Sequence, residues 1–239
     1  MVASGKERNE LRNAALAAGI ALIIMTLAAF FSYGYVHGSL VAEGDAAATV
    51  RNIASSGMLF HAEILGWLVI LICDIIVAWA FSIYLKPVHR SLSLLCAWLR
   101  LIYTAILAIA VSHLLLASLL ANGTDALSLM ETDRLAAQVM LELAAFDLIW
   151  SVGLIVFGAH LLLAGWLALR SGEIPKLLGV LLLIASIGYM IIHLGSAFLP
   201  QYGRFVTVFE YALAVPMTAG ELGFGLWLLF KGGKASAKA

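Results

Sequence analysis

Five long apolar segments of the chain each carry one ionisable residue close to the middle of the segment. These residues are Asp74, His113, His160, His193 and Glu221. Ionisable side chains are costly in the hydrocarbon core of a membrane and usually mark a functional site there. One such residue can simply bond a neighbouring helix, but five at similar depth in successive segments favour an internal polar site.

Two pairs of carboxylates add a direction to this site. Glu63 and Asp74 are eleven residues apart, and so are Glu210 and Glu221. Eleven residues are about three helical turns, so each pair shares one helix face, with its first member about 16 Å nearer the outside. Pro216 is expected to bend the last segment beside Glu221, as at many membrane binding sites. The pattern predicts a polar cavity that opens outside and ends near Asp74 and Glu221, although packing faces with satisfied hydrogen bonds are the simpler interpretation.

Three chemistries compete for these residues. Imidazoles and carboxylates suit zinc or another transition metal, two histidines on facing helices can ligate haem, and Asp, Glu and His chains relay protons or ions. The sequence contains no H-x-x-x-H or H-E-x-x-H spacing, and no Walker, G-x-S-x-G or dinucleotide motif. It therefore assigns no catalytic residue, metal or cofactor.

The elements that position these residues are transmembrane helices. The chain has 239 residues, of which 63% are hydrophobic and 12% charged, whereas a soluble domain has about 25% charged residues. A helix needs roughly 20 apolar residues to cross a bilayer, and long unbroken runs exclude a β-barrel. The sequence predicts an all-α, polytopic six-helix bundle, with spans at about 13–36, 58–85, 91–121, 140–169, 176–199 and 205–230.

The basic residues predict the orientation of this bundle. Ten flank the spans on one side and three on the other, which predicts a multi-pass protein of the cell (inner) membrane with both termini cytoplasmic. The ten are Lys6, Arg8, Arg12, Lys86, Arg90, Arg170, Lys176, Lys231, Lys234 and Lys238, and the three are Arg51, Arg134 and Arg204. We expect a cytoplasmic N-terminus (1–12), a six-span domain (13–230) and a flexible basic tail (231–239). Lys and Arg number 14, as do Asp and Glu, so the expected partner is the lipid bilayer, with no nucleic acid; a small ligand or ion fits the polar site.

Several single residues carry further expectations. Asp45 is expected to cap a short outside helix within 44–57. Two pairs of small residues, Ala15 with Gly19 and Ala219 with Gly223, are expected to allow close helix packing. Arg100 is expected to snorkel to the cytoplasmic interface, because its depth is expected to differ from that of Asp74. The six tryptophans are expected mostly at span ends or lipid-facing surfaces.

The motifs along the chain resemble a bacterial membrane-protein family known only as domain of unknown function 4386. The likeness covers nearly the whole chain. The stretches that carry it are Gly44-Asp45-Ala46 with Arg51-Asn52-Ile53-Ala54-Ser55; Cys73-Asp74 to Tyr84-Leu85-Lys86-Pro87-Val88; Gly153-Leu154-Ile155 through His160 to Ser171-Gly172; Pro175 with Leu178-Gly179-Val180-Leu181 and Gly188-Tyr189; and Pro216, Gly220-Glu221 and Leu226-Trp227-Leu228-Leu229.

The resemblance implies a six-span bacterial inner-membrane protein and no established activity. Asp74, His160 and Glu221 lie in the family-like stretches. Relatives often have a Ser-Asp pair where this chain has Gly66-Trp67, and an Asp where it has Ile192. The polar site on the second and fifth spans is therefore expected to differ here.

The sequence favours a small-solute or ion permease, or a proton-coupled binding protein, because the carboxylate pairs line a path from the outside to the membrane centre. An intramembrane zinc enzyme is the alternative, with the same residues as ligands and base. A non-catalytic structural or regulatory membrane subunit is the third hypothesis. In the permease or binding-protein hypothesis, one site is formed by Asp74, His160 and Glu221.

Overall fold

The fold is a bundle of long helices, as predicted. The computed structural model describes residues 5–123, 131–199, 201 and 203–234, and within these it contains helices and no strand. Six helical segments are long and apolar enough to cross a membrane; four agree with the predicted spans within one residue at each end, whereas the first and the fourth begin eight residues earlier than predicted. They are Gly5–Leu40, Gly57–Tyr84, Arg90–Ala121, Thr132–Arg170, Lys176–Phe198 and Val206–Phe230. Residues 235–239 of the predicted flexible tail lie outside the described residues.

The first span is not a uniform α-helix. It consists of α1 (Gly5–Ala29), the π-helical segment η1 (Phe30–His37) and the short α2 (Gly38–Leu40). A π-helical turn widens the backbone locally and often occurs at functional sites. The apolar run that predicts this span gives no sign of the change in winding.

A short helix follows the first span where the sequence predicts one. This helix, α3, runs over Ala46–Ser55, and the carboxylate of Asp45 accepts a hydrogen bond of 2.8 Å from the backbone N–H of Ala48. Such a bond satisfies one of the free N–H groups of the first turn. The predicted N-cap is therefore confirmed.

The remaining helices are α4 (Gly57–Tyr84), α5 (Arg90–Asn122), α6 (Thr132–Arg170), α7 (Lys176–Phe198) and α8 (Gly203–Phe230). The chain divides into two compact units. Unit 1 comprises residues 1–24, 72–104 and 151–239, and unit 2 comprises residues 25–71 and 105–150. Since both units contain parts of several helices, neighbours along one helix can belong to different packing environments.

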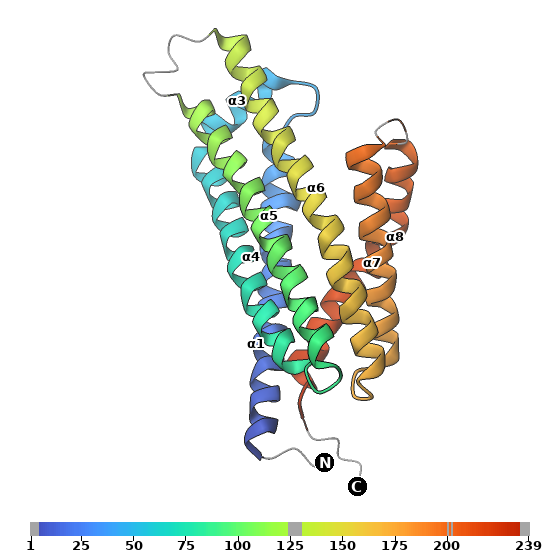
Figure 1. The fold of residues 1–239 in the computed structure, drawn as a ribbon. Coiled ribbons are helices and arrows are strands. Elements are labelled where there is room, and N and C mark those ends of the chain that lie inside the picture. Colours follow the sequence, from blue (N-terminus) through green and yellow to red (C-terminus); the bar gives the residue numbers. More distant parts are fainter. Residues whose placement is uncertain (1–4, 124–130, 200, 202, 235–239) are drawn as a thin grey trace. The chain divides into compact units, whose positions relative to one another are not determined.

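In unit 1 the two ends of the chain meet. Arg12 on α1 donates hydrogen bonds to the backbone carbonyls of Leu229 (2.9 Å) and Gly232 (2.7 Å) at the end of α8. A cation there satisfies free carbonyls and complements the helix dipole. Gly19 lies against the backbone of Leu229, so the predicted close packing at Gly19 is found. The helices α7 and α8, shown in orange and red, lie side by side and antiparallel (Figure 1).

In unit 2 the core is aromatic. Trp67 is only 1% exposed and packs edge-to-face on Phe146 and Trp150, at ring centroid distances of 5.3 and 4.9 Å. Trp67 is therefore an exception to the expectation that the tryptophans lie mostly at span ends or lipid faces. Aromatic rings bury a large apolar area and pair favourably edge to face, so the position works as a core position despite its indole N–H.

Candidate functional site

A deeply buried ion pair in unit 1 joins α4 and α5. An Nη2 atom of Arg100 lies 2.6 Å from Oδ1 of Asp74, and both side chains are excluded from solvent. Isolated charges in such an environment would cost several kcal/mol each. The two groups therefore compensate each other within the span.

A third helix adds a histidine to this ion pair. Nη1 of Arg100 lies 3.1 Å from Nε2 of His160 on α6, and Nδ1 of His160 lies 2.9 Å from the carbonyl oxygen of Cys96. A guanidinium can only donate hydrogen bonds, so Nε2 must be the acceptor and Nδ1 carries the proton that is donated to Cys96. This assignment makes His160 a neutral imidazole that orients the guanidinium toward Asp74.

The position of Arg100 corrects the sequence-based expectation. Arg100 is 1% exposed and pairs with Asp74 instead of snorkelling to the interface. The expectation took its depth from the apolar run that follows Arg100. The distance from the turn at Pro87 predicts the depth of Arg100 better, because Asp74 and Arg100 are each thirteen residues from Pro87. In an antiparallel hairpin, residues equally distant from the turn lie at the same level.

Aromatic side chains connect this network to the last span. Arg100 lies over the ring of Phe157 at 5.3 Å, and the Phe157 ring lies 5.2 Å from that of Tyr189 on α7. The Tyr189 hydroxyl donates a hydrogen bond of 2.8 Å to Oε1 of Glu221 on α8. The Glu221 carboxyl group also interacts electrostatically with Arg100 and Asp74. Asp74, His160 and Glu221 thus belong to one continuous cluster in unit 1.

His193 joins the same cluster from α7. Its ring stacks on that of Tyr189 at 5.9 Å, and its Nδ1 lies 2.9 Å from the hydroxyl of Ser151 on α6. Ser151 is buried and His193 is half-buried. We call the group Asp74, Arg100, His160, Tyr189, His193 and Glu221 the unit 1 cluster.

With this geometry established, comparison with known proteins identifies the family. Residues 17–232 match the family described as Domain of unknown function (DUF4386). The chain belongs to this family. It is also 33% identical over 174 residues to an uncharacterized protein of Archaeoglobus fulgidus, over 73% of this chain and 86% of the relative. No solved structure shows significant similarity to the chain.

The other predicted site residues of this DUF4386 protein lie elsewhere. Glu63 and His113 belong to unit 2, where Glu63 pairs with His37 at 2.8 Å and His113 pairs with Glu142 at 2.7 Å. Glu210 is exposed on α8. Of the seven residues, the structure therefore brings Asp74, His160, His193 and Glu221 together in unit 1.

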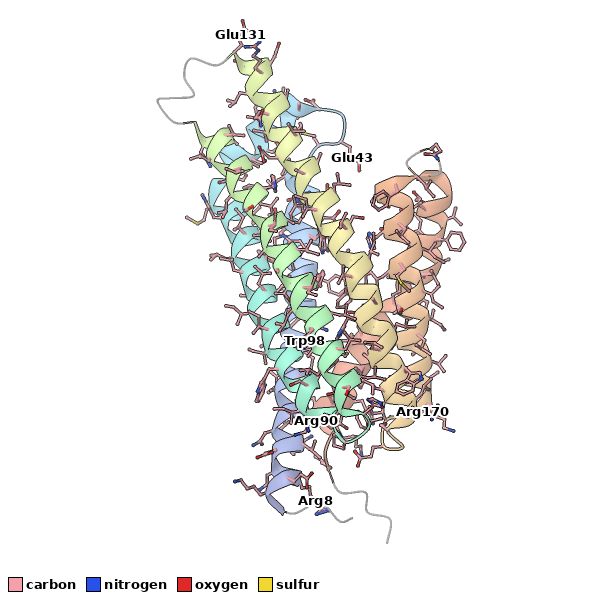
Figure 2. The ribbon with its side chains drawn as sticks, in the orientation of Figure 1. Arg8, Glu43, Arg90, Trp98, Glu131 and Arg170 are labelled. Carbon is pink, nitrogen blue, oxygen red and sulfur yellow. The ribbon has the colours of Figure 1, made fainter. Side chains whose placement is uncertain are left out.

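The predicted polar cavity stays a prediction. A cavity of about 450 Å³ in unit 1 is lined by residues that include Pro87, His89, Trp166 and Arg170, near the turns that join α4 to α5 and α6 to α7. Asp74 and Glu221 do not line it. Figure 2 shows Arg90 and Arg170, together with Arg8, at this same end of unit 1.

The residues that the structure describes do not fit a metal centre. Within the described part of the chain, no group of three or more His, Cys, Asp or Glu side chains is arranged to hold a metal ion. Asp74 and His160 share Arg100, a cation, between them. A metal ion at that position would replace the guanidinium or face its charge.

Two ionisable residues of unit 2, His37 and Asp147, were not predicted from the sequence as site residues. His37 is buried beside Glu63, and Asp147 lies on α6 one residue after the buried Phe146. His37 lies at the end of the first apolar run and Asp147 lies off the centre of the fourth, so a search for ionisable residues at mid-span passes over both. The pair of His113 with Glu142 could have been predicted, because the two residues lie at similar distances from the connection between α5 and α6.

Proposed function

We propose that this DUF4386 protein is a proton-coupled permease or binding protein for a small solute or ion, with Glu221 as the carboxylate that carries the proton. The observation that supports this proposal is the surroundings of Glu221. It lies within a membrane span, and its hydrogen-bond partner is the neutral hydroxyl of Tyr189.

Charge compensation explains why these surroundings matter. Among the described residues, His37–Glu63, Arg100–Asp74 and His113–Glu142 form ion pairs, and Glu221 belongs to none of these three. The nearby Arg100 is already neutralised by Asp74. A carboxylate within a bilayer is neutralised by a proton or a bound cation, because an isolated charge there is very costly. The Glu221 carboxylate is therefore suited to exchange a bound proton for a bound cation.

Neighbouring groups support a path for the proton. His193 stacks on Tyr189 and reaches Ser151, so hydroxyl and imidazole groups follow one another from Glu221 along α7. Pro216 lies inside α8, five residues before Glu221. A proline in a helix leaves one carbonyl without its helical bond, and such interruptions accompany binding sites in transporters.

A structural or regulatory subunit is the second candidate function. The observation that favours it is the network of Asp74, Arg100 and His160, in which a buried acid, a buried base and a neutral imidazole bond one another across three helices. Such a network holds helices in register without any ligand. The zinc-enzyme alternative has no comparable support, because Arg100 lies between two of its would-be ligands.

The test of the proposal is Glu221→Gln in protein reconstituted into liposomes that contain a pH-sensitive dye. We expect wild-type protein to move protons down an imposed gradient and E221Q to fall to the level of protein-free liposomes, because an amide cannot release a proton. Glu210→Gln is the matched control on the same helix, since Glu210 is exposed; it should behave like wild type. A carbodiimide, which modifies protonated carboxyl groups, should label Glu221 in wild-type protein even if transport requires an unknown co-substrate. An unlabelled Glu221, together with equal flux in both proteins, would contradict the proposal.

We also propose that both termini are cytoplasmic and that the protein resides in the inner membrane of its cell. The basic end of unit 1, which carries Arg8, Arg90 and Arg170, supports this orientation (Figure 2). Reporter enzymes fused at Gly123 and after Ala239 check it. A reporter after Ala239 should be active only as a cytoplasmic enzyme and one at Gly123 only as an exported enzyme. The reverse pattern would show that the orientation is inverted.

A further inference from the structure

Unit 2 contains a second polar centre, which lies beside its aromatic core and extends to the exposed side chains of Tyr33 and Asp147. We call it the aromatic–acid cluster. It consists of Tyr33 and His37 from η1, Glu63 and Trp67 from α4, and Phe146, Asp147 and Trp150 from α6. The rings pack on one another directly: Tyr33 lies 4.8 Å from Trp150, and His37 lies 5.8 Å from Phe146.

The first part of this cluster is a buried pair. Nδ1 of His37 lies 2.8 Å from Oε1 of Glu63, and the two side chains are 10% and 0% exposed. The hydroxyl of Ser32 also donates a hydrogen bond of 3.0 Å to the backbone carbonyl of Glu63. The π-helical winding of η1 ends at His37, so the irregular segment of the first span presents this histidine to α4.

The second part is Asp147. Its carboxyl group is hydrogen-bonded by the side chain of Tyr33 and interacts electrostatically with both His37 and Glu63. The groups that face His37 are therefore one acid from α4 and one from α6. Fully ionised, two carboxylates and one imidazolium carry a net charge of minus one. Asp147 is exposed at the surface of α6, but it lies within a membrane-spanning helix, where an uncompensated charge is costly.

Two buried polar atoms also lack partners in the cluster. Oε2 of Glu63 and Nε1 of Trp67 have no hydrogen-bond partner within the part of the chain that the structure describes. The residues are one turn apart on the same face of α4, as four residues of spacing place them. One atom can only donate and the other accepts when ionised. Buried polar atoms are normally satisfied. Protonation of Oε2 would remove its unsatisfied charge, and a small hydrogen-bond acceptor would satisfy Nε1, which can only donate.

We propose that the aromatic–acid cluster is a second proton-binding site, which holds one carboxyl proton on Glu63 or Asp147 beyond the proton that His37 and Glu63 share. The extra proton removes the excess negative charge of the cluster. This inference does not rest on the role of Glu221, because the two sites share no residue.

Infrared spectroscopy of the C=O stretch of protonated carboxyl groups tests this inference at neutral pH. The parent protein is E221Q in lipid nanodiscs, so that Glu221 contributes no signal. We expect the parent to show a protonated carboxyl band and D147N in that background to lose it, because one carboxylate then balances His37. E63Q should lose the band for the same reason. Removing the positive charge with His37→Gln should instead increase the band roughly two-fold, because both acids must then be neutral.

Glu142→Gln is the matched control, because Glu142 is a carboxylate of α6 in the same unit that already has its own histidine partner. It should leave the band unchanged. Absence of the band in the parent would overturn the proposal. So would a band that survives D147N but disappears in E63Q, since the carboxyl proton would then belong to Glu63 opposite a neutral imidazole. Because Asp147 is exposed, its replacement should be tolerated even if E63Q disturbs folding.

Discussion

Arg100→Met is expected to destabilise the protein by about 3–5 kcal/mol, which is the range for breaking a buried ion pair by removing one partner. Methionine is unbranched and adaptable, so packing is roughly retained. The substitution leaves the carboxylate of Asp74 buried without its cation, and Nε2 of His160 loses its donor. Unfolding in mixed micelles of denaturing and mild detergent measures the change in free energy.

A double-substitution cycle separates the lost ion pair from any change in packing. Asp74→Asn combined with R100M should be less destabilised than the sum of the two single variants, because a neutral amide needs no cation. Arg90→Met is the control on the same helix, since Arg90 is exposed at the start of α5, and it should change stability by less than about 0.5 kcal/mol. Additive effects of D74N and R100M would show that the two residues do not compensate each other.

Gly19→Ala is expected to destabilise unit 1 by about 1–3 kcal/mol, the usual effect of overpacking. A Cβ atom on Gly19 would lie 2.7 Å from the backbone nitrogen of Leu229 and 2.8 Å from the carbonyl oxygen of Gly225. Both contacts are with backbone, which cannot rotate away as a side chain can, so α1 and α8 must separate. Gly19→Val should have a larger effect for the same reason.

The control for this prediction is Gly5→Ala on the same helix. A Cβ atom at Gly5 meets nothing within 4 Å, and alanine favours a helix over glycine. The melting temperature in detergent should therefore be unchanged or slightly higher in G5A and lower in G19A. Equal melting temperatures would mean that α1 and α8 are not in close backbone contact.

The spans could be predicted because their cause is local. A bilayer requires about 20 apolar residues in a row, and the chain shows this six times in its own sequence. The Asp45 cap is local too, since the capping carboxylate and the N–H group that it bonds are three residues apart. Both features depend on residues that are close together in the chain, so no knowledge of helix packing is needed to find them.

The polar contacts between helices could be predicted only in part. Helical phase shows which residues of one helix share a face, but it does not show what that face meets. Glu63 and Asp74 share a face of α4, yet one pairs with His37 in unit 2 and the other with Arg100 in unit 1. Glu210 and Glu221 have the same spacing, yet Glu210 is exposed. The π-helical turn that brings His37 to Glu63 has no counterpart in the hydropathy pattern.

Measuring distance from a turn would have recovered two of the missed pairs. Asp74 and Arg100 are equally distant from Pro87, and His113 and Glu142 lie 14 and 15 residues from the middle of the segment that joins α5 to α6. Antiparallel neighbours obey this rule whatever their side chains are. It fails for Tyr33, His37 and Asp147, because the helices that carry them are not joined by a single short turn.

The contact between α1 and α8 has a consequence for the order of events during synthesis. Arg12 bonds the carbonyl of a residue 220 positions later in the chain, and Gly19 packs on the same helix end. The N-terminal segment of a nascent chain emerges first, so α1 enters the membrane long before its partner has been translated. Unit 1 can complete its packing only after the last span has left the ribosome. Until then Gly19 and Arg12 of α1 lack their contacts with α8 and are accessible to lipid or to other membrane proteins.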